Sequence, residues 1–149
     1  MPTHSLPRLP EPYNEPVKSY APGTPEREEL RVRLAQMQAE RIEIPCVIGG
    51  KEVRTGDTFE AVMPHDKDHV LADVHAGGPE HVQQAIDAAG AAWRDWSRMP
   101  WEERAAVFLR AAELLSGPWR ATINAATMLN QSKTVHQAEI DAACELTDF

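Results

Sequence analysis

Acidic residues near the end of the sequence have the spacing of one helix face. Asp141, Glu145 and Asp148 stand at positions i, i+4 and i+7, so a helix would bring their carboxylates to one side. Either these carboxylates form a solvated face, or one of them points into a site that further sequence completes and receives a cationic group there. Composition and spacing leave both interpretations open.

The two cysteines do not have the surroundings of a catalytic thiol. Cys46 lies in the apolar run IPCVIG and Cys144 lies in the helical stretch DAACEL, and neither has a base at a spacing that indicates nucleophilic catalysis. Two cysteines in a chain long enough to bury a core do not indicate a disulfide scaffold. We expect two free thiols that pack as small buried hydrophobic residues.

Histidines and glycines raise the question of a metal or phosphate site. The six histidines are His4, His65, His69, His75, His81 and His136. His65 and His69 have helix-like spacing, but they lie between expected strands, where a spacing of four does not bring side chains together. We therefore expect solvated loop histidines and no metal ion. The chain lacks both G-x-G-x-x-G and G-x-x-x-x-G-K-[ST], and its two Gly-Gly pairs, at 49–50 and 77–78, are interpreted as turns.

Composition limits the classes of partner. The chain has 149 residues, of which 42% are hydrophobic, 26% charged and 6% aromatic, and its net charge of −8 opposes contact with nucleic acid or anionic membranes. No apolar run approaches the roughly 20 residues of a membrane span, and the first residues have no signal-peptide core. We expect a cytosolic or organelle-matrix protein of about one domain, with no nucleic-acid or membrane partner.

The first part of the chain is expected to be an extended arm. Residues 1–25 hold seven of the 12 prolines, each of which removes a backbone donor and restricts its predecessor. Such an arm is either mobile or laid across a larger body. From Thr24, a candidate N-cap before Pro25, the pattern predicts a helix over about 25–40. One face of this helix carries Leu30, Leu34 and Met37.

The remaining sequence predicts short strands followed by helices. Residues 42–64 combine β-branched residues with Gly-rich turns, and residues 69–76 alternate as a further strand. Helical periodicity then runs over 79–99, 101–115 and 118–128. The first two of these helices have apolar faces made of Val82, Ala85, Ile86, Ala89, Trp93 and Trp96, and of Trp101, Ala105, Phe108, Leu109, Ala112 and Leu115.

The last segment predicts one more helix without a stop signal. Its apolar stripe comprises Val135, Ala138, Ala142, Leu146 and Phe149. The sequence ends on Asp148 and Phe149, with no Gly, Asn or basic last turn, and Phe149 is still in phase with the expected buried face. We expect a chain that is cut inside a helix.

Several runs resemble one enzyme family. The run SGPWRATINAATMLNQSKTVHQAEIDAACELTDF is similar to a segment of the 1-pyrroline-5-carboxylate dehydrogenases, within the aldehyde dehydrogenase superfamily. The runs NEPVKSYAPGTPER, IPCVIGGKEV and EERAAVFLRAAELLSGPWR resemble N-terminal pieces of that family in the same order. The resemblance covers the chain from Asn14 to Phe149.

The resemblance implies an incomplete, helix-rich part of an α/β fold. It would comprise the arm 1–25 and, over 26–149, short strands and a helix cluster of the Rossmann-type NAD-binding domain. The family uses NAD to oxidise glutamate γ-semialdehyde, a small-molecule substrate formed from 1-pyrroline-5-carboxylate, to glutamate in proline catabolism. It assembles as homo-oligomers in the bacterial cytoplasm, or in the mitochondrial matrix of eukaryotes. Absence of transit-peptide character favours the bacterial cytoplasm here.

The family's chemistry is almost entirely missing from this sequence. Its nucleophilic cysteine, general-base glutamate, oxyanion-binding asparagine and NAD loop have no counterpart, so no catalytic, cofactor-binding or metal-binding residue is assigned. We expect the chain to be inactive alone. The alternatives are a non-catalytic fragment that binds full-length aldehyde dehydrogenase subunits, and a self-contained helical domain of unrelated function.

One substrate-binding residue carries over from the resemblance. Glu145 matches the glutamate of the family's AxELIDF helix, which lines the aldehyde site and contacts the amino end of the substrate. A carboxylate beside a cationic amine supplies a charge-assisted hydrogen bond. Thr147 stands where the family has an aliphatic residue, and this departure would weaken one packing position.

Overall fold

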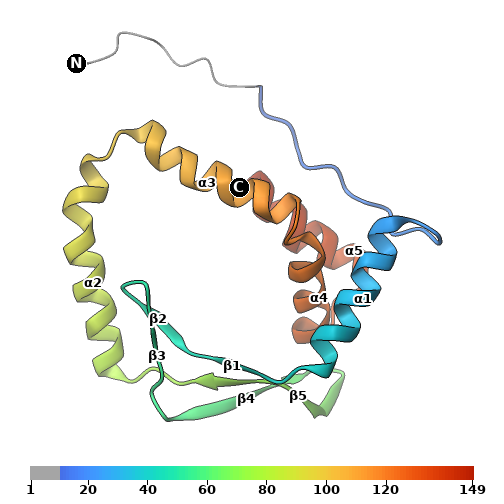
Figure 1. Ribbon diagram of the computed structural model, residues 1–149, viewed down its shortest axis with the longest axis horizontal. Coiled ribbons are helices and arrows are strands. Elements are labelled where there is room, and N and C mark those ends of the chain that lie inside the picture. Colours follow the sequence, from blue (N-terminus) through green and yellow to red (C-terminus); the bar gives the residue numbers. More distant parts are fainter. Residues whose placement is uncertain (1–10) are drawn as a thin grey trace.

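The computed structural model describes residues 11–149, so His4 and the first ten residues of the expected arm lie outside the described residues. The helices are α1 (Pro25–Ala39), α2 (Pro79–Arg98), α3 (Trp101–Ser116), α4 (Arg120–Gln131), α5 (Val135–Ala138) and α6 (Glu145–Asp148), with the π-helix η1 (Glu139–Cys144) between the last two (Figure 1). The strands are β1 (Ile42–Ile44), β2 (Cys46–Ile48), β3 (Lys51–Val53), β4 (Thr58–Met63) and β5 (Asp66–His75).

The strands form two small sheets. In the first, the order is β1-β5-β4, with β1 parallel and β4 antiparallel to the long strand β5. In the second, β2 and β3 pair as an antiparallel hairpin. Gly49 and Gly50 form its turn with φ of 58° and 76°, a backbone region that glycine adopts without a steric penalty, as expected for a turn pair.

Proline and glycine delimit the helices as the sequence predicts. Pro25 begins α1, Pro79 begins α2 after Gly78, and Pro100 separates α2 from α3. One detail of the sequence interpretation is wrong. Thr24 occupies the N-cap position, but its hydroxyl donates to the carbonyl of Ala21 at 2.8 Å instead of capping the helix.

The core lies where α1 meets α4. Leu30, from the predicted face of α1, is buried with Tyr20 and Ala125, and the partly buried side chains around them are Leu34, Met37, Met128 and Val135. The periodicity of the first helix therefore identifies its packing face correctly. The described part of the chain has no helix long and apolar enough to cross a membrane.

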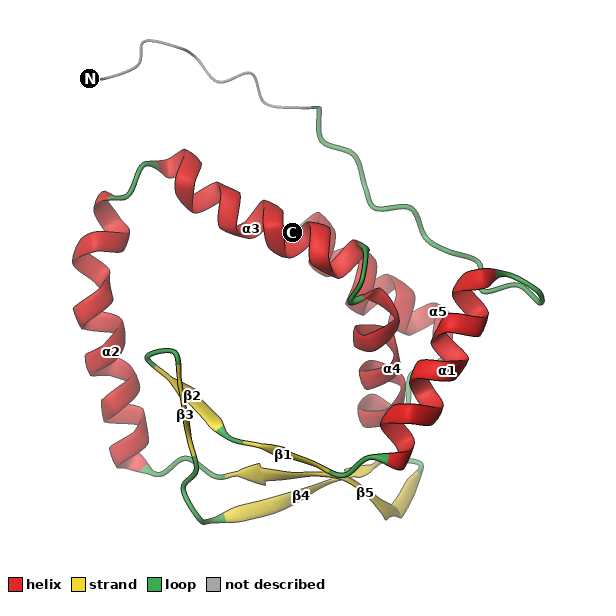
Figure 2. Ribbon diagram, in the orientation of Figure 1, coloured by secondary structure: helices red, strands yellow, loops and turns green. Residues whose placement is uncertain are grey.

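Helices α2 and α3 are present within two residues of the predicted bounds, but their apolar faces are exposed. Neither helix has a buried residue. Trp93 is 68% exposed, Phe108 66% and Ile86 59%. Figure 2 shows α2 on the opposite side of the molecule from α1 and α4. Large exposed apolar faces of this kind mark interaction surfaces, ligand grooves or aggregation-prone regions.

Candidate functional site

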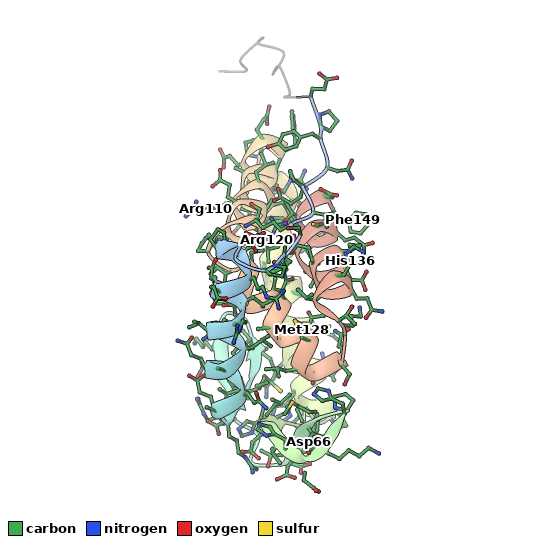
Figure 3. The ribbon with its side chains drawn as sticks, turned by 90° about the vertical axis from the view of Figure 1, so that its right-hand side faces the viewer. Asp66, Arg110, Arg120, Met128, His136 and Phe149 are labelled. Atoms are coloured by element: carbon green, nitrogen blue, oxygen red, sulfur yellow. The ribbon has the colours of Figure 1, made fainter. Side chains whose placement is uncertain are left out.

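A buried ion pair joins α4 to the π-helix. Glu139 is completely buried and Arg120 is 3% exposed. The Arg120 guanidinium donates from Nη2 to Oε1 of Glu139 at 2.5 Å and from Nε to Oε2 at 3.3 Å. Two-nitrogen contact of this kind fixes the relative orientation of the two side chains as well as their distance. Figure 3 shows Arg120 between α1 and the C-terminal helices.

Three further groups donate hydrogen bonds to the Glu139 carboxylate. The backbone N–H of Lys18 donates to Oε1 at 2.7 Å, and the Tyr20 hydroxyl donates to Oε2 at 2.8 Å. The Asn124 amide donates to Oε2 at 2.8 Å and also to the Tyr20 hydroxyl oxygen at 2.9 Å. A buried carboxylate is tolerated when its oxygens are paired in this way.

The cluster shifts the titration of its members. Burial opposes ionisation of Glu139, but the hydrogen bonds from Arg120 and from the Lys18 N–H outweigh it and lower the pKa of Glu139. Burial and the bond to Glu139 raise the pKa of the Tyr20 hydroxyl. Burial and the negative charge of Glu139 likewise raise the pKa of the Cys144 thiol.

Residues 14–20 lie across this cluster. Arg120 Nη2 donates to the carbonyl of Pro16 at 2.8 Å, and Arg120 Nη1 donates to the Glu15 carboxylate. Asp148 accepts from the Asn14 amide at 2.9 Å and from the backbone N–H of Glu15 at 2.6 Å. The arm was expected to be either mobile or laid across a larger body. Residues 14–20 agree with the second alternative, because they contact α4 and the C-terminal helices.

The π-helix determines where Glu145 lies. Its wide turn is closed by the Glu145 N–H, which donates to the carbonyl of Ile140, five residues earlier. Cys144 is buried, whereas the next side chain, Glu145, is exposed and makes no hydrogen bond to the described residues. Thr147 donates to the carbonyl of Ala143 at 2.8 Å, so its hydroxyl is satisfied locally.

The three acids predicted to share a face have separate surroundings. Asp141 pairs with Lys133 at 2.6 Å, and Asp148 holds the arm. Glu145 is the one of the three whose carboxylate the described residues leave unbound. All three side chains are exposed, so both interpretations of this acidic face stay open.

The same wide turn corrects the predicted apolar stripe. Ala138 and Ala142 are buried as expected, but Leu146 is 48% exposed and Phe149 is 98% exposed. In an α-helix each residue advances by about 100°, so one extra residue in a turn moves every later side chain off the stripe. The prediction that Phe149 is in phase with the buried face is wrong.

The predictions for cysteines and histidines hold only in part. Both thiols are free and Cys144 is buried as expected, but Cys46 is only half-buried. His75 lies buried in β5 instead of in a solvated loop. Its Nδ1 accepts from the Thr55 N–H at 3.0 Å, so Nε2 carries the proton and donates to Glu43 at 2.9 Å. His69, His81 and His136 also lie in regular elements.

Residues 11–149 were considered as the setting of a metal ion and of the NAD phosphates. They contain no group of His, Cys, Asp and Glu side chains that fits a metal ion. The buried cation Arg120 is occupied by two carboxylates, and the glycine pairs lie in the β2–β3 turn and before α2. The described residues contain no glycine-rich phosphate loop for NAD, and no reaction step through NAD is derived from them.

The family of the chain follows from comparison with known proteins. The sequence pattern of the aldehyde dehydrogenase family matches residues 52–149. The chain belongs to the aldehyde dehydrogenase family, and its helix-rich fold with short strands corresponds to an N-terminal part of the fold of that family. The fold class inferred from the sequence is therefore confirmed.

Its relatives are more specific. The chain is 50% identical over 143 residues to the delta-1-pyrroline-5-carboxylate dehydrogenase of Agaricus bisporus and 46% identical over 136 residues to the human mitochondrial enzyme. These alignments cover 95% and 91% of this chain but 26% and 24% of the relatives. The chain thus spans about a quarter of the length of the curated relatives it matches. The family resemblance inferred from sequence motifs is confirmed.

Solved structures that resemble this chain are also pyrroline-5-carboxylate dehydrogenases. The Mycobacterium tuberculosis delta-pyrroline-5-carboxylate dehydrogenase bound with NAD matches with a TM-score of 0.94 and 48% identity, over 98% of this chain and 28% of that one. The 1-pyrroline-5-carboxylate dehydrogenase from Thermus with bound NAD matches with a TM-score of 0.86 and 27% identity, over 95% of this chain and 27% of that one.

Proposed function

We propose that this chain is the N-terminal part of an NAD-dependent dehydrogenase that oxidises glutamate γ-semialdehyde, derived from 1-pyrroline-5-carboxylate, to glutamate. The observation that carries the proposal is the 48% identity and TM-score of 0.94 over 98% of the chain with the M. tuberculosis enzyme. In this proposal residues 1–25 are an arm and residues 26–149 are part of the cofactor domain. The nucleophile, the general base and the NAD loop belong to sequence outside these residues.

Glu145 supplies the chain's own contribution to substrate binding. Its carboxylate is exposed and unbound among the described residues, while its backbone is held by the π-turn that starts at Glu139. An ammonium group on the substrate would give it a charge-assisted hydrogen bond, and the fixed backbone would orient the substrate chain. Glu145 is thus a substrate-positioning residue and not the nucleophile or base.

We propose for the enzyme the setting that the family resemblance implies. The substrate is a small molecule, the assembly is a homo-oligomer, and neither nucleic acid nor membrane takes part. The human and mouse relatives are mitochondrial. For this chain the bacterial cytoplasm is the proposed location, with the mitochondrial matrix as the location if the source is eukaryotic.

A chimera tests the proposal. This chain replaces the matching segment of the M. tuberculosis enzyme, and NAD reduction is followed with 1-pyrroline-5-carboxylate as substrate. We expect activity within about ten-fold of the parent enzyme, which is a difference of about 1.4 kcal/mol in transition-state stabilisation. The 149-residue chain assayed alone serves as the matched control and should show no turnover. Turnover by the chain alone, or a folded chimera without activity, would contradict the proposal.

The exposed apolar side chains of α2 and α3 favour a second role. Val82, Ile86, Trp93, Phe108 and Leu109 are each more than half exposed. The matched segment is only 26% of the A. bisporus relative. We therefore propose that the remaining part of an aldehyde dehydrogenase subunit packs on the apolar faces of these helices. In this second proposal the chain acts as a non-catalytic fragment that binds full-length subunits through this region. Co-purification of the tagged chain with the intact M. tuberculosis enzyme tests it, and a chain that stays monomeric in that mixture would contradict it.

A further inference from the structure

The contacts of the arm bracket Glu145 on both sides. Lys18 and Tyr20 bind Glu139, at the start of the π-helix, whereas Asn14 and Glu15 bind Asp148, after Glu145. The arm residues therefore hold the helical segment at two points, one before and one after the proposed substrate carboxylate. None of these contacts touches Glu145 itself.

The segment that the arm holds contains a π-turn, which needs stabilising contacts from its surroundings. A π-turn has poorer packing and hydrogen-bond geometry than an α-helix and persists where its surroundings stabilise it. In this chain the turn begins at the buried Glu139, whose carboxylate accepts from Arg120, Lys18, Tyr20 and Asn124. It ends at Cys144, whose Sγ lies 3.6 Å from Arg120 Nη2. The Arg120–Glu139 pair thus contacts both ends of the wide turn.

The arm is also strained where it binds Glu139. Tyr20 has a φ of 53°, a left-handed conformation that is unfavourable for an aromatic L-residue. Its hydroxyl nevertheless donates to Glu139 and accepts from Asn124, inside the buried cluster. A strained residue persists when the contacts around it over-determine its position, which indicates that the Tyr20–Glu139 bond is an important part of this arrangement.

Loss of the wide turn would redirect Glu145. If the segment relaxed to an ordinary α-helix, side chains after the turn would rotate by about 100° relative to Glu139, because one residue fewer would occupy the turn. The Glu145 carboxylate would then leave its present position, and Asp148 would leave its contacts with Asn14 and Glu15.

We infer that Tyr20, Arg120 and Glu139 are positioning residues, which hold the π-turn and thereby aim the Glu145 carboxylate at the amino end of the substrate. The inference rests on the proposed function of Glu145 and adds to it three residues that do not touch substrate. The extended segment 14–20 then has a role in substrate recognition, although it lies before the first helix.

The most conservative test removes a single hydroxyl. Tyr20→Phe keeps the ring but deletes the donor to Glu139, and Tyr13→Phe is the matched control because Tyr13 is on the same arm and 84% exposed. Both are made in the chimera with the M. tuberculosis enzyme, alone and combined with Glu145→Ala. The measured values are KM for the semialdehyde, KM for NAD, and kcat.

We expect Tyr20→Phe to raise KM for the semialdehyde roughly three- to ten-fold, which is less than the loss of a direct hydrogen bond to a charged group because Tyr20 acts on the substrate only through Glu145. KM for NAD should stay unchanged, and Tyr13→Phe should match the parent. In the Glu145→Ala background, Tyr20→Phe should have little further effect, because there is no carboxylate left to position.

Two other outcomes would contradict the positioning role or the role of Glu145. Equal effects of Tyr20→Phe with and without the Glu145 side chain would contradict the positioning role but leave the role of Glu145 intact. An unchanged semialdehyde KM in Glu145→Ala would contradict both the inference and the proposed role of Glu145.

Hydrogen exchange gives a readout that does not depend on activity. In the 149-residue chain and in the chimera, Tyr20→Phe should speed amide exchange of peptides from residues 139–149 by roughly five- to ten-fold and leave peptides from α2 unchanged. Tyr13→Phe should change neither. Unaltered exchange over 139–149 in Tyr20→Phe, or no protection there in the parent, would overturn the inference.

Discussion

Arg120 and Glu139 form a two-nitrogen ion pair, at 2.5 and 3.3 Å, in which both side chains are almost completely removed from solvent. The pair connects three parts of the chain, because Arg120 also binds the carbonyl of Pro16 and the carboxylate of Glu15. Residues separated by more than a hundred positions are thereby fixed around one carboxylate. A relationship of this kind makes the stability of the whole region depend on a few polar atoms.

Removal of Glu139 should be severe. Glu139→Ala leaves the Arg120 charge buried with one carboxylate fewer, and loss of one partner of a buried pair costs about 3–5 kcal/mol. Asp141→Ala, which deletes the partly exposed pair with Lys133 on the same helical segment, should cost at most about 1 kcal/mol. Urea unfolding followed by circular dichroism gives both free energies of unfolding. Equal losses in the two variants would contradict the importance of the buried pair.

Acid should selectively remove the contribution of Glu139. Its pKa in the folded chain lies below the ordinary 4.5, so its stabilising effect is complete above that pH and is lost as pH falls through the lower folded value. The difference in free energy of unfolding between the parent and Glu139→Gln should therefore shrink as pH falls below about 4.5. Glu43 and Asp73 also have lowered pKa values. Because both proteins contain them, their contributions cancel in the difference in free energy of unfolding. A difference that widens with acid would contradict this assignment.

The two thiols should react at different rates. Cys144 is buried, and burial together with the charge of Glu139 raises its pKa, so little thiolate is present for attack on a disulfide reagent. Cys46 is half-buried and more accessible. We expect one fast and one slow phase with a chromogenic disulfide, and loss of the fast phase in Cys46→Ser. A fast phase that persists in Cys46→Ser would show that Cys144 is accessible.

Tryptophan fluorescence should report whether α2 and α3 become covered. All four tryptophans are exposed in the structure, from 39% for Trp96 to 68% for Trp93. The isolated chain should emit like solvent-exposed indole, and emission should shift to the blue in the chimera as these helices pack. Trp93→Phe should reduce the shift. Blue-shifted emission from the isolated chain would mean that the helices are covered without further polypeptide.

Local patterns were sufficient to predict most helices and strands. Pro25, Pro79 and Pro100 mark helix starts, and the periodicity of Leu30 and its neighbours identifies a true packing face. The same periodicity in α2 identifies an apolar face but not what covers it. Exposure of Trp93 therefore could not be predicted, because burial depends on contacts with sequence that periodicity does not describe.

The polar cluster was missed for a related reason. Glu139 looks like an ordinary solvated acid next to the stripe residue Ala138, and its burial depends on Arg120 and on Tyr20, which lies 119 residues away. Prediction of the last segment also assumed an uninterrupted α-helical period, and the π-turn breaks that period after Glu139. One signal was available in the sequence: Arg120 and Asn124 stand four apart on the small-residue face of α4, where polar side chains need partners.

In the proposed function the Glu145 carboxylate holds the substrate amine, and a comparison of two aldehydes in Glu145→Gln tests this role. In the chimera, KM is measured for glutamate γ-semialdehyde and for the aldehyde of the same chain length that lacks the amino group. We expect Glu145→Gln to raise the first KM by roughly 10- to 100-fold, as loss of a hydrogen bond to a charged group allows, and to leave the second within about two-fold. Equal increases for the two aldehydes, or no increase for either, would contradict it.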